Sequence, residues 1–178
     1  MTRIGVRRAV EQDAARIAEV RMASWRAAYR GIVPAAFLAD MESELPVRVE
    51  RWRAVLQDPA REPAFVAEDP DQGIIGFIRG GRARPPHFGM ESELSTLYLL
   101  REFWRQGLGR ELTQALVTQL IHQGFRTMIT WVFTANPATS FYERLGGCRL
   151  GTQRIVLGGV SLPMFAYGWT DLPTAFHA

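Results

Sequence analysis

The sequence predicts an α+β or three-layer α/β domain. Its strand-like and helix-like segments follow one another in the order β-α-α-β-β-β-α-β-α-β-β. Two pairs of apolar runs are joined by short turn sequences, "PDQ" and "GG", as in antiparallel hairpins. This irregular order favours a mixed fold over a regular doubly wound one. A length of 178 residues without repeats or a low-complexity linker fits a single domain.

The first third of the chain predicts one strand and two helical regions. "TRIGVRRA" (2–9) is typical of a short opening strand. Residues 11–30 carry apolar side chains at steps of three and four, which indicates one long or kinked helix that ends at Gly31. After Pro34, "FLADM" and "VRVERWRAVLQ" predict a second helical region, which "DPAREP" ends.

The middle of the chain predicts three strands and an amphipathic helix. Runs 64–69 and 73–81 form a hairpin across "PDQ", and the loop "RARPPH" separates them from a strand at 93–100. Residues 107–122 place leucines on one face and charged or amide side chains elsewhere, which predicts a helix that Gly124 ends.

The last third predicts a buried strand, a helix and a second hairpin. The strand is "TMITWVF", and "NPATSFYERLGG" (136–147) predicts a helix with Asn136 as N-cap and a proline at its first position. Strands of about 148–157 and 160–169 follow, turned by the glycine pair between them.

Composition indicates a protein without a membrane span or a metal centre. No apolar run approaches the roughly 20 residues that cross a bilayer, and the N-terminus lacks the apolar stretch of a signal peptide. Cys148 is the only cysteine, so neither an intrachain disulfide nor a multi-cysteine metal site is expected. We therefore expect a cytoplasmic protein that uses no metal.

The charge of the chain limits its partners and its chemistry. A net charge of +3 without blocks of like charge does not indicate a nucleic-acid partner, but it fits a basic site for one polyanionic small molecule. Apart from three histidines, every basic side chain is an arginine, because the chain contains no lysine. This excludes Schiff-base chemistry and a P-loop lysine.

The stretch "LREFWRQGLGREL" (100–112) is a glycine-containing turn that leads into a helix, a common way to bind a phosphate. Arg110 stands where a P-loop has lysine, and Leu112 stands where a dinucleotide fingerprint has its third glycine. Two interpretations remain: a loop of backbone N–H groups around a diphosphate, or a plain turn that needs glycine for its geometry. Arg101, Arg105 and Arg110 would supply charge to the first.

Two longer stretches then resemble the GNAT superfamily of acyl-CoA-dependent N-acetyltransferases. "LSTLYLLREFWRQGLGRELTQALV" is similar to its motif A and "ITWVFTANPATSFYERLGGCRLG" to its motif B, although Trp104 and Arg101 depart from the usual pattern. "SWRAAYRGIVP" and "RWRAVL" resemble a common bacterial subgroup, whose acceptors are uncharacterised. The resemblance implies a three-layer α/β/α fold, with a mixed, mostly antiparallel sheet of six to seven strands flanked by about four helices. It would cover residues 1–170 as one domain and leave 171–178 as a C-terminal tail.

The resemblance also implies acetyl-CoA as cosubstrate. Its pantetheine arm would pair with the strand at Leu97 and Leu99, and Asn136 would touch the arm or only cap its helix. The pyrophosphate would lie on the loop residues Arg105, Gln106, Gly107, Leu108, Gly109 and Arg110.

Catalysis would then proceed by direct attack of a primary amine of a small molecule or peptide on the thioester. Tyr142 matches the motif tyrosine, and a phenol with a pKa of about 10 can protonate a departing thiolate. Glu93 is the first candidate for deprotonating the amine, with Glu91 or water alone as alternatives. The family leads us to expect that the first helices roof the acceptor pocket, which makes Trp25, Tyr29 and Arg30 candidates there.

Other functions stay open on the sequence alone. The same loop would serve a CoA-binding sensor without catalysis or a nucleotide-binding module. A homodimer is a further expectation from the resemblance, whereas neither nucleic acid nor a membrane is expected as a partner.

Overall fold

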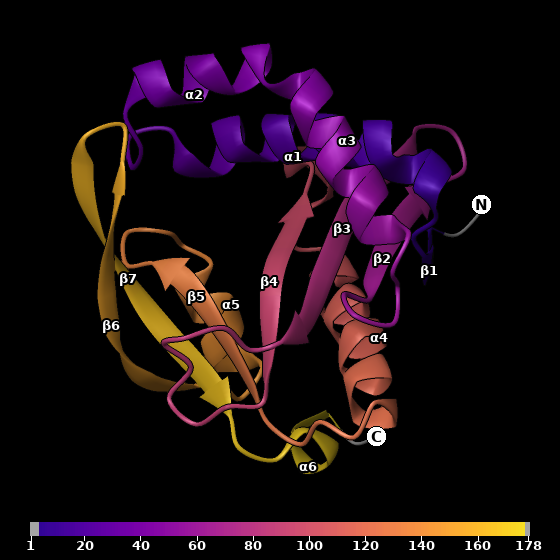
Figure 1. Cartoon of the computed structure of the whole chain (residues 1–178), viewed down its shortest axis with the longest axis vertical. Coiled ribbons are helices and arrows are strands. Elements are labelled where there is room, and N and C mark those ends of the chain that lie inside the picture. The colour runs from indigo at the N-terminus through magenta and orange to yellow at the C-terminus, as the bar shows by residue number, and fades with distance from the viewer. Residues whose placement is uncertain (1–3, 177–178) are drawn as a thin grey trace.

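The computed structural model describes residues 4–176, apart from the side chains of residues 41 and 42. It confirms the three-layer arrangement around a mixed, mostly antiparallel sheet (Figure 1). Seven strands lie in the order β1-β2-β3-β4-β5-β7-β6, and among them β4 and β5 form the one parallel pair. The strands are β1 Gly5–Arg8, β2 Ala64–Asp69, β3 Gly73–Arg82, β4 Ser92–Leu99, β5 Met128–Phe133, β6 Cys148–Leu157 and β7 Val160–Trp169.

Six α-helices of the described chain cover the two faces of the sheet. They are α1 Ala14–Tyr29, α2 Ala35–Ser43, α3 Leu45–Leu56, α4 Leu108–His122, α5 Thr139–Arg144 and α6 Leu172–Phe176, with 3-10 turns η1 Glu11–Asp13 and η2 Arg101–Phe103. Ile17 of α1 and Trp52 of α3 are buried on one face, and Leu116 of α4 and Tyr142 of α5 on the other. The second helical region of the sequence is thus two helices, and α6 is an addition.

The helix predicted at 136–147 is shorter than the sequence indicated. The Asn136 carboxamide oxygen accepts the N–H of Ala138 at 2.9 Å, and the Asn136 carbonyl accepts the N–H of Thr139 at 3.1 Å. These two bonds close a turn, as asparagine side chains commonly do. The helix therefore begins at Thr139 with Ala138 as its N-cap residue, and the prediction of Asn136 as N-cap was wrong.

The C-terminal segment joins the packed structure. Leu172 and Phe176 of α6 are buried, and the Phe176 ring lies 6.1 Å from the ring of Trp169. The Leu172 N–H also donates to the Arg126 carbonyl at 2.8 Å. A boundary after residue 170 therefore lies inside the fold, because apolar residues beyond it complete the core.

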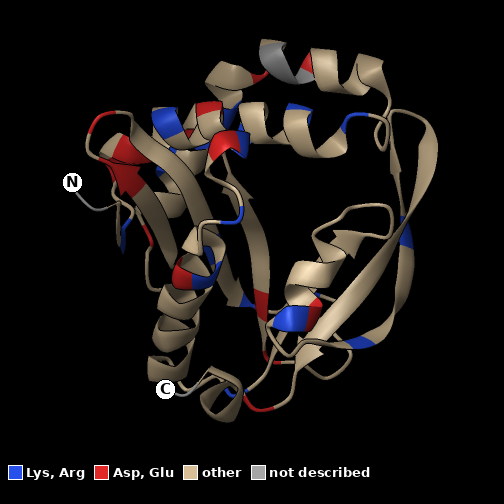
Figure 2. Ribbon diagram, turned by 180° about the vertical axis from the view of Figure 1, so that it is seen from behind, with Lys and Arg blue, Asp and Glu red and all other residues tan. Residues whose placement is uncertain are grey.

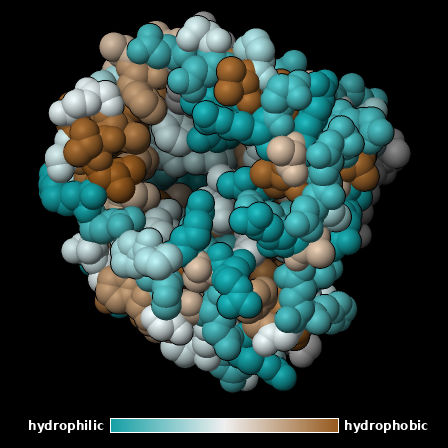
Figure 3. Space-filling model, viewed as in Figure 1, coloured by the Kyte–Doolittle hydropathy of each residue, from teal (hydrophilic) through white to brown (hydrophobic). Residues whose placement is uncertain are grey.

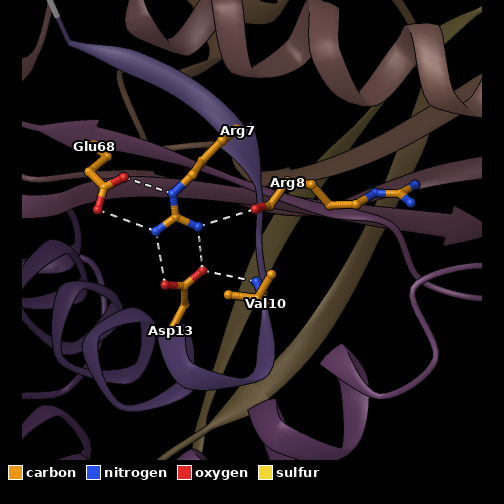
Figure 4. A network of polar contacts seen from close by, with 5 residues as sticks. All are labelled: Arg7, Arg8, Val10, Asp13 and Glu68. Atoms are coloured by element: carbon orange, nitrogen blue, oxygen red, sulfur yellow. Dashed lines mark hydrogen bonds and ion pairs between the residues drawn. The ribbon is translucent and has the colours of Figure 1, made fainter.

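The start of the chain is held by one arginine (Figure 4). The Arg7 guanidinium donates to Asp13 at 2.7 Å and to Glu68 at 2.7 Å, and so ties β1 to η1 and β2. The Asp13 carboxylate also accepts the N–H of Val10 at 2.9 Å. Burial opposes ionisation of Asp13, but the hydrogen bonds from Arg7 and Val10 outweigh it and lower the pKa of this carboxyl group.

Candidate active site

The sheet opens at its centre, between β4 and β5. These strands pair at Ser92–Leu94 with Met128–Thr130 and then diverge (Figure 1). Gly80 pairs with Leu94 and Arg79 with Thr96, so Ser95 is the extra residue of a β-bulge that bends β4 at this point. The Thr130 hydroxyl donates to the Leu94 carbonyl at 2.9 Å where the strands part. In the space-filling view of Figure 3, which is seen from the same side as Figure 1, the surface is hollowed over the place where β4 and β5 diverge.

The open half of β4 offers backbone groups to a ligand. The Leu100 N–H donates to the Ile75 carbonyl at 2.9 Å, and Leu99 lies opposite Gly76. Because antiparallel pairs alternate, the main-chain groups of Leu97 and Leu99 point away from β3. The Leu99 carbonyl already accepts Ser24 Oγ at 3.1 Å and Trp104 Nε1 at 2.8 Å. Leu97 is therefore the residue whose main chain faces the opening most completely.

The loop after β4 ends in an uncapped helix start. Gly107 is the N-cap of α4 with φ 88°, and no side chain caps the helix there. The N–H groups of Arg110 and Glu111 bond to the Gly107 carbonyl at 2.9 and 3.1 Å, which leaves those of Leu108 and Gly109 for a ligand. The first turn of a 15-residue helix also carries partial positive charge. This is the geometry of an anion site.

Side chains around this loop divide into two groups. Arg105 and Arg110 are exposed, and Figure 2 shows charged residues about the start of α4. The Gln106 side chain instead donates to the Glu102 carbonyl at 2.9 Å, so only its main chain is left for an anion. Trp104, whose role the sequence left open, fastens the loop to the end of β4 through its bond to Leu99.

Gly109 has a packing reason as well. A Cβ there would lie 3.3 Å from the Phe141 ring of α5, so glycine lets α4 and α5 approach closely. Leu108 beside it is 5% exposed and belongs to the core. Gly107 therefore serves the turn and Gly109 the packing, and this geometry also leaves the N–H groups of Leu108 and Gly109 open to an anion.

Tyr142 lies against the opening from the α5 side. It is buried, with its ring centroid 6.1 Å from Tyr167 and 6.4 Å from Trp169. Burial raises its pKa, Tyr98 raises it further, and a hydrogen bond with the Thr130 hydroxyl acts in the opposite direction. The phenol therefore keeps its proton, as a general acid must. Asn136 is also buried, but its carboxamide oxygen is taken by Ala138.

The predicted acceptor residues separate into two places. Trp25 and Tyr29 stack edge to face at 4.6 Å, and the Tyr29 hydroxyl lies 3.2 Å from that of Tyr98 on β4. Arg30 is exposed and lies elsewhere, in a surface pocket of about 260 Å³ that Arg101 also lines. Sequence reasoning missed Tyr98, although its position between Leu97 and Leu99 would have placed it on the opposite face of the same strand.

The two candidate bases lie at the closed end of the opening. Glu93 is 8% exposed and accepts two bonds from the Arg84 guanidinium, the shorter at 3.0 Å. Glu91 is exposed and accepts the N–H groups of Arg126 and Thr127 at 2.6 and 3.2 Å, so it anchors the start of β4. The Glu93 carboxylate is thus held by a side chain of the loop before β4, whereas that of Glu91 is held by the backbone before β5.

Between residues 4 and 176, no helix is long and apolar enough to cross a membrane. The same part of the chain holds no group of three or more histidine, cysteine, aspartate or glutamate side chains that would bind a metal ion.

A strand opening beside an uncapped helix start, with a protonated tyrosine between them, fits an acyl-transferring enzyme. Comparison with known proteins identifies the kind: residues 18–147 match the Acetyltransferase (GNAT) family. The chain belongs to this family, as the two motifs indicated, and is an N-acetyltransferase.

The similarity to known proteins extends over nearly the whole chain. An uncharacterised N-acetyltransferase of Bacillus subtilis (strain 168), YuaI, is 32% identical over 169 residues, which cover 95% of this chain and 94% of that protein. The PaiA N-acetyltransferase of Thermoplasma acidophilum, solved with coenzyme A, has a TM-score of 0.71 at 20% identity, covering 94% of this chain and 100% of its own. YncA of Salmonella typhimurium, solved with acetyl-CoA, has a TM-score of 0.70 at 19% identity, over 95% and 94%. These structures share the fold.

Proposed function

We propose that the protein transfers the acetyl group of acetyl-CoA to a primary amine of a small molecule or peptide by direct attack. The observation that carries this proposal is the pairing of two features at one place: the uncapped start of α4 and the unpaired inner edge of β4. An anion site next to a free strand edge suits a cosubstrate that has a diphosphate at one end and an amide-containing arm at the other.

In this arrangement the pyrophosphate lies on the loop from Arg105 to Arg110. The N–H groups of Leu108 and Gly109 point at it, and the exposed guanidinium groups of Arg105 and Arg110 add charge-assisted contacts. We assign Arg30 to the phosphate groups as well, because it shares its pocket with Arg101 immediately before this loop. The arm runs past Leu97, whose main-chain groups face the opening, and Asn136 contacts it through its amide nitrogen.

The chemistry needs a proton acceptor and a proton donor. Attack of the neutral amine on the thioester carbonyl forms the new C–N bond; the C–S bond then breaks, and the nitrogen loses the proton that restores the phenol of Tyr142. Tyr142 donates its proton to the leaving thiolate, since its raised pKa keeps the phenol protonated at neutral pH. Glu93 receives the ammonium proton through water, because it lies at the base of the acceptor side of β4 and Arg84 holds its carboxylate in place.

Release of free thiol from acetyl-CoA, with amines, amino acids and N-terminal peptides as acceptors, tests the proposal. We expect turnover with at least one class of primary amine and thermal stabilisation by acetyl-CoA. Stabilisation without turnover would indicate a CoA-binding sensor. Greater stabilisation by NAD or ATP than by acetyl-CoA would indicate a nucleotide-binding module instead.

A further inference from the structure

A group of buried polar atoms without hydrogen-bond partners lies beside the opening of the sheet. This group consists of atoms on Arg21, Trp25, Arg48, Arg79 and Thr96; one further such atom in the described part of the chain is on His87, in the loop after β3. The atoms of the group come from four elements that pack on one another: α1, α3, β3 and β4. Buried polar groups are normally paired, so a cluster of orphans at one place calls for a ligand.

Several contacts bring these side chains together. The Arg21 guanidinium lies 4.9 Å from the Trp25 ring, and Arg79 is the strand partner of Thr96. Burial lowers the pKa of Arg21, and the neighbouring charges of Arg48 and Arg79 lower it too, although Tyr98 and Tyr29 act in the opposite direction. The charges of Arg48 and Arg79 therefore lie close enough to Arg21 to affect its pKa, as do Tyr98 and Tyr29 of the opening.

The chemistry of the orphans defines the missing partner. The unpaired atoms are Arg21 Nη1, Trp25 Nε1, Arg48 Nε, Arg79 Nε and Thr96 Oγ1. Guanidinium and indole nitrogens can only donate hydrogen bonds, and a hydroxyl can donate one. A ligand that satisfies them must present acceptors, and a negative charge would offset the like charges that converge here.

Arg21 is the member that most needs such a ligand. Arg48 pairs with Glu44 at 2.6 Å and Arg79 with Glu62 at 3.2 Å, so each keeps one carboxylate partner. Arg21 forms no ion pair in the described structure, and its neighbour Trp25 offers only the face of a ring. A half-buried cation without a counter-ion is costly, and it is retained most readily where a ligand supplies the charge.

The position of this cation relative to the reacting groups assigns its ligand. The Arg21 guanidinium lies 4.9 Å from the Trp25 ring, and the Tyr98 ring on β4 lies 6.4 Å from the same ring. A molecule with its anionic group at Arg21 would therefore extend past Tyr98 along β4 toward the thioester. We propose that the acceptor is a small amine with an anionic group, a carboxylate or a phosphonate, and that Arg21 binds this group. The inference rests on the proposed function and names its substrate class.

Matched acceptors test this substrate class. Each protein amino acid is compared with its amide and with an aminoalkylphosphonate of similar size, and release of free thiol from acetyl-CoA is followed. We expect the acid or the phosphonate to exceed the amide in kcat/KM by about 30-fold, the range of a charge-assisted hydrogen bond. The anion with the higher kcat/KM shows whether the acceptor is a carboxylate or a phosphonate. Equal kcat/KM for acid, phosphonate and amide overturns the inference.

Variants at two arginines locate the recognition. Arg21→Met removes the charge but keeps an apolar chain beside Trp25, and we expect it to abolish the preference for the anion while amides react as before. Arg51→Met makes the same change of charge at an exposed position of α3 and is the matched control. A merely structural role of Arg21 would lower kcat/KM for acid and amide alike, which would also overturn the inference.

A binding measurement separates this inference from the proposed function. N-acetyl amino acids, which retain the carboxylate and need no turnover, are titrated into wild type and Arg21→Met by calorimetry. Binding to wild type that Arg21→Met loses supports the anion site even if no amine is acetylated. Failure of wild type to bind them, while simple amines are acetylated, overturns the anion site and leaves the acetyltransferase intact.

Discussion

Replacing Tyr142 by phenylalanine tests the proton donor with little disturbance of the fold. The ring would keep its contacts with Tyr167 and Trp169, because only the hydroxyl is removed. The contact of the phenol hydroxyl with the Thr130 hydroxyl would be lost. Even a full hydrogen bond contributes only about 1 kcal/mol, and its loss lowers the Tm of a domain of this size by about 2–4 °C. The protein should therefore remain folded at assay temperature.

The expected kinetic effect of Tyr142→Phe is much larger than the effect on stability. General acid catalysis contributes about 100-fold or more, so kcat should fall by that factor. Affinity for acetyl-CoA should not change, since the proposed diphosphate site lies at the start of α4. The assay is release of free thiol under saturating acceptor, with coenzyme A affinity measured by calorimetry.

Tyr167→Phe is the matched control. Its hydroxyl bonds to Glu143 at 2.7 Å, and the residue is buried in the same cluster. It should lose similar stability but keep its kcat. An unchanged kcat in Tyr142→Phe, or an equal loss in both variants, would refute the assignment of Tyr142 as proton donor.

Three further predictions concern the loop, the base and the N-terminal network. Gly107→Ala adds a Cβ that meets nothing within 4 Å, so only its φ of 88° matters: unfolding in urea should show a loss of about 1–2 kcal/mol, and coenzyme A affinity should fall. Equal free energies of unfolding for wild type and Gly107→Ala would contradict the left-handed conformation of Gly107. Glu93→Gln should lower kcat with little change in coenzyme A affinity; an unaltered pH profile of kcat would exclude it as base. Asp13→Asn should cost about 1–2 kcal/mol at pH 7. Because the pKa of Asp13 is lowered on folding, this stabilisation is present above the unfolded pKa of about 3.9 and is lost as pH falls through the folded value. A difference from wild type that persisted at acidic pH would contradict it.

Features carried by neighbouring residues could be predicted from the sequence. The loop at 105–110, the strand at Leu97 and the tyrosine at 142 each lie in one continuous motif, where glycine, alternation and helix spacing are visible. Local turn chemistry was harder, because an asparagine followed by proline fits both an N-cap and a turn. In the structure, one hydrogen bond to the Asn136 side chain and one to its carbonyl close the turn.

Features assembled from distant segments could not be predicted. Arg21, Arg48 and Arg79 lie on three elements, and nothing in the local sequence shows that the charges of the other two act on Arg21. The same holds for α6, since a five-residue helix has too little periodicity to be recognised before its core partners are known. Arg30 was grouped with Trp25 and Tyr29 by proximity along the chain, but the end of α1 turns it to another surface.

With the proposed placement of the pantetheine arm, the short ladder between β4 and β5 would make the cosubstrate a structural component. Three residue pairs join the two halves of the sheet there, whereas β3 and β4 share seven and β5 and β7 share six. A pantetheine arm in this gap would act as an eighth, non-peptide strand that joins the two halves of the sheet by hydrogen bonds. Hydrogen exchange at the Leu97 amide should then slow most on addition of coenzyme A. Without coenzyme A, the amides along the gap between β4 and β5 should exchange faster.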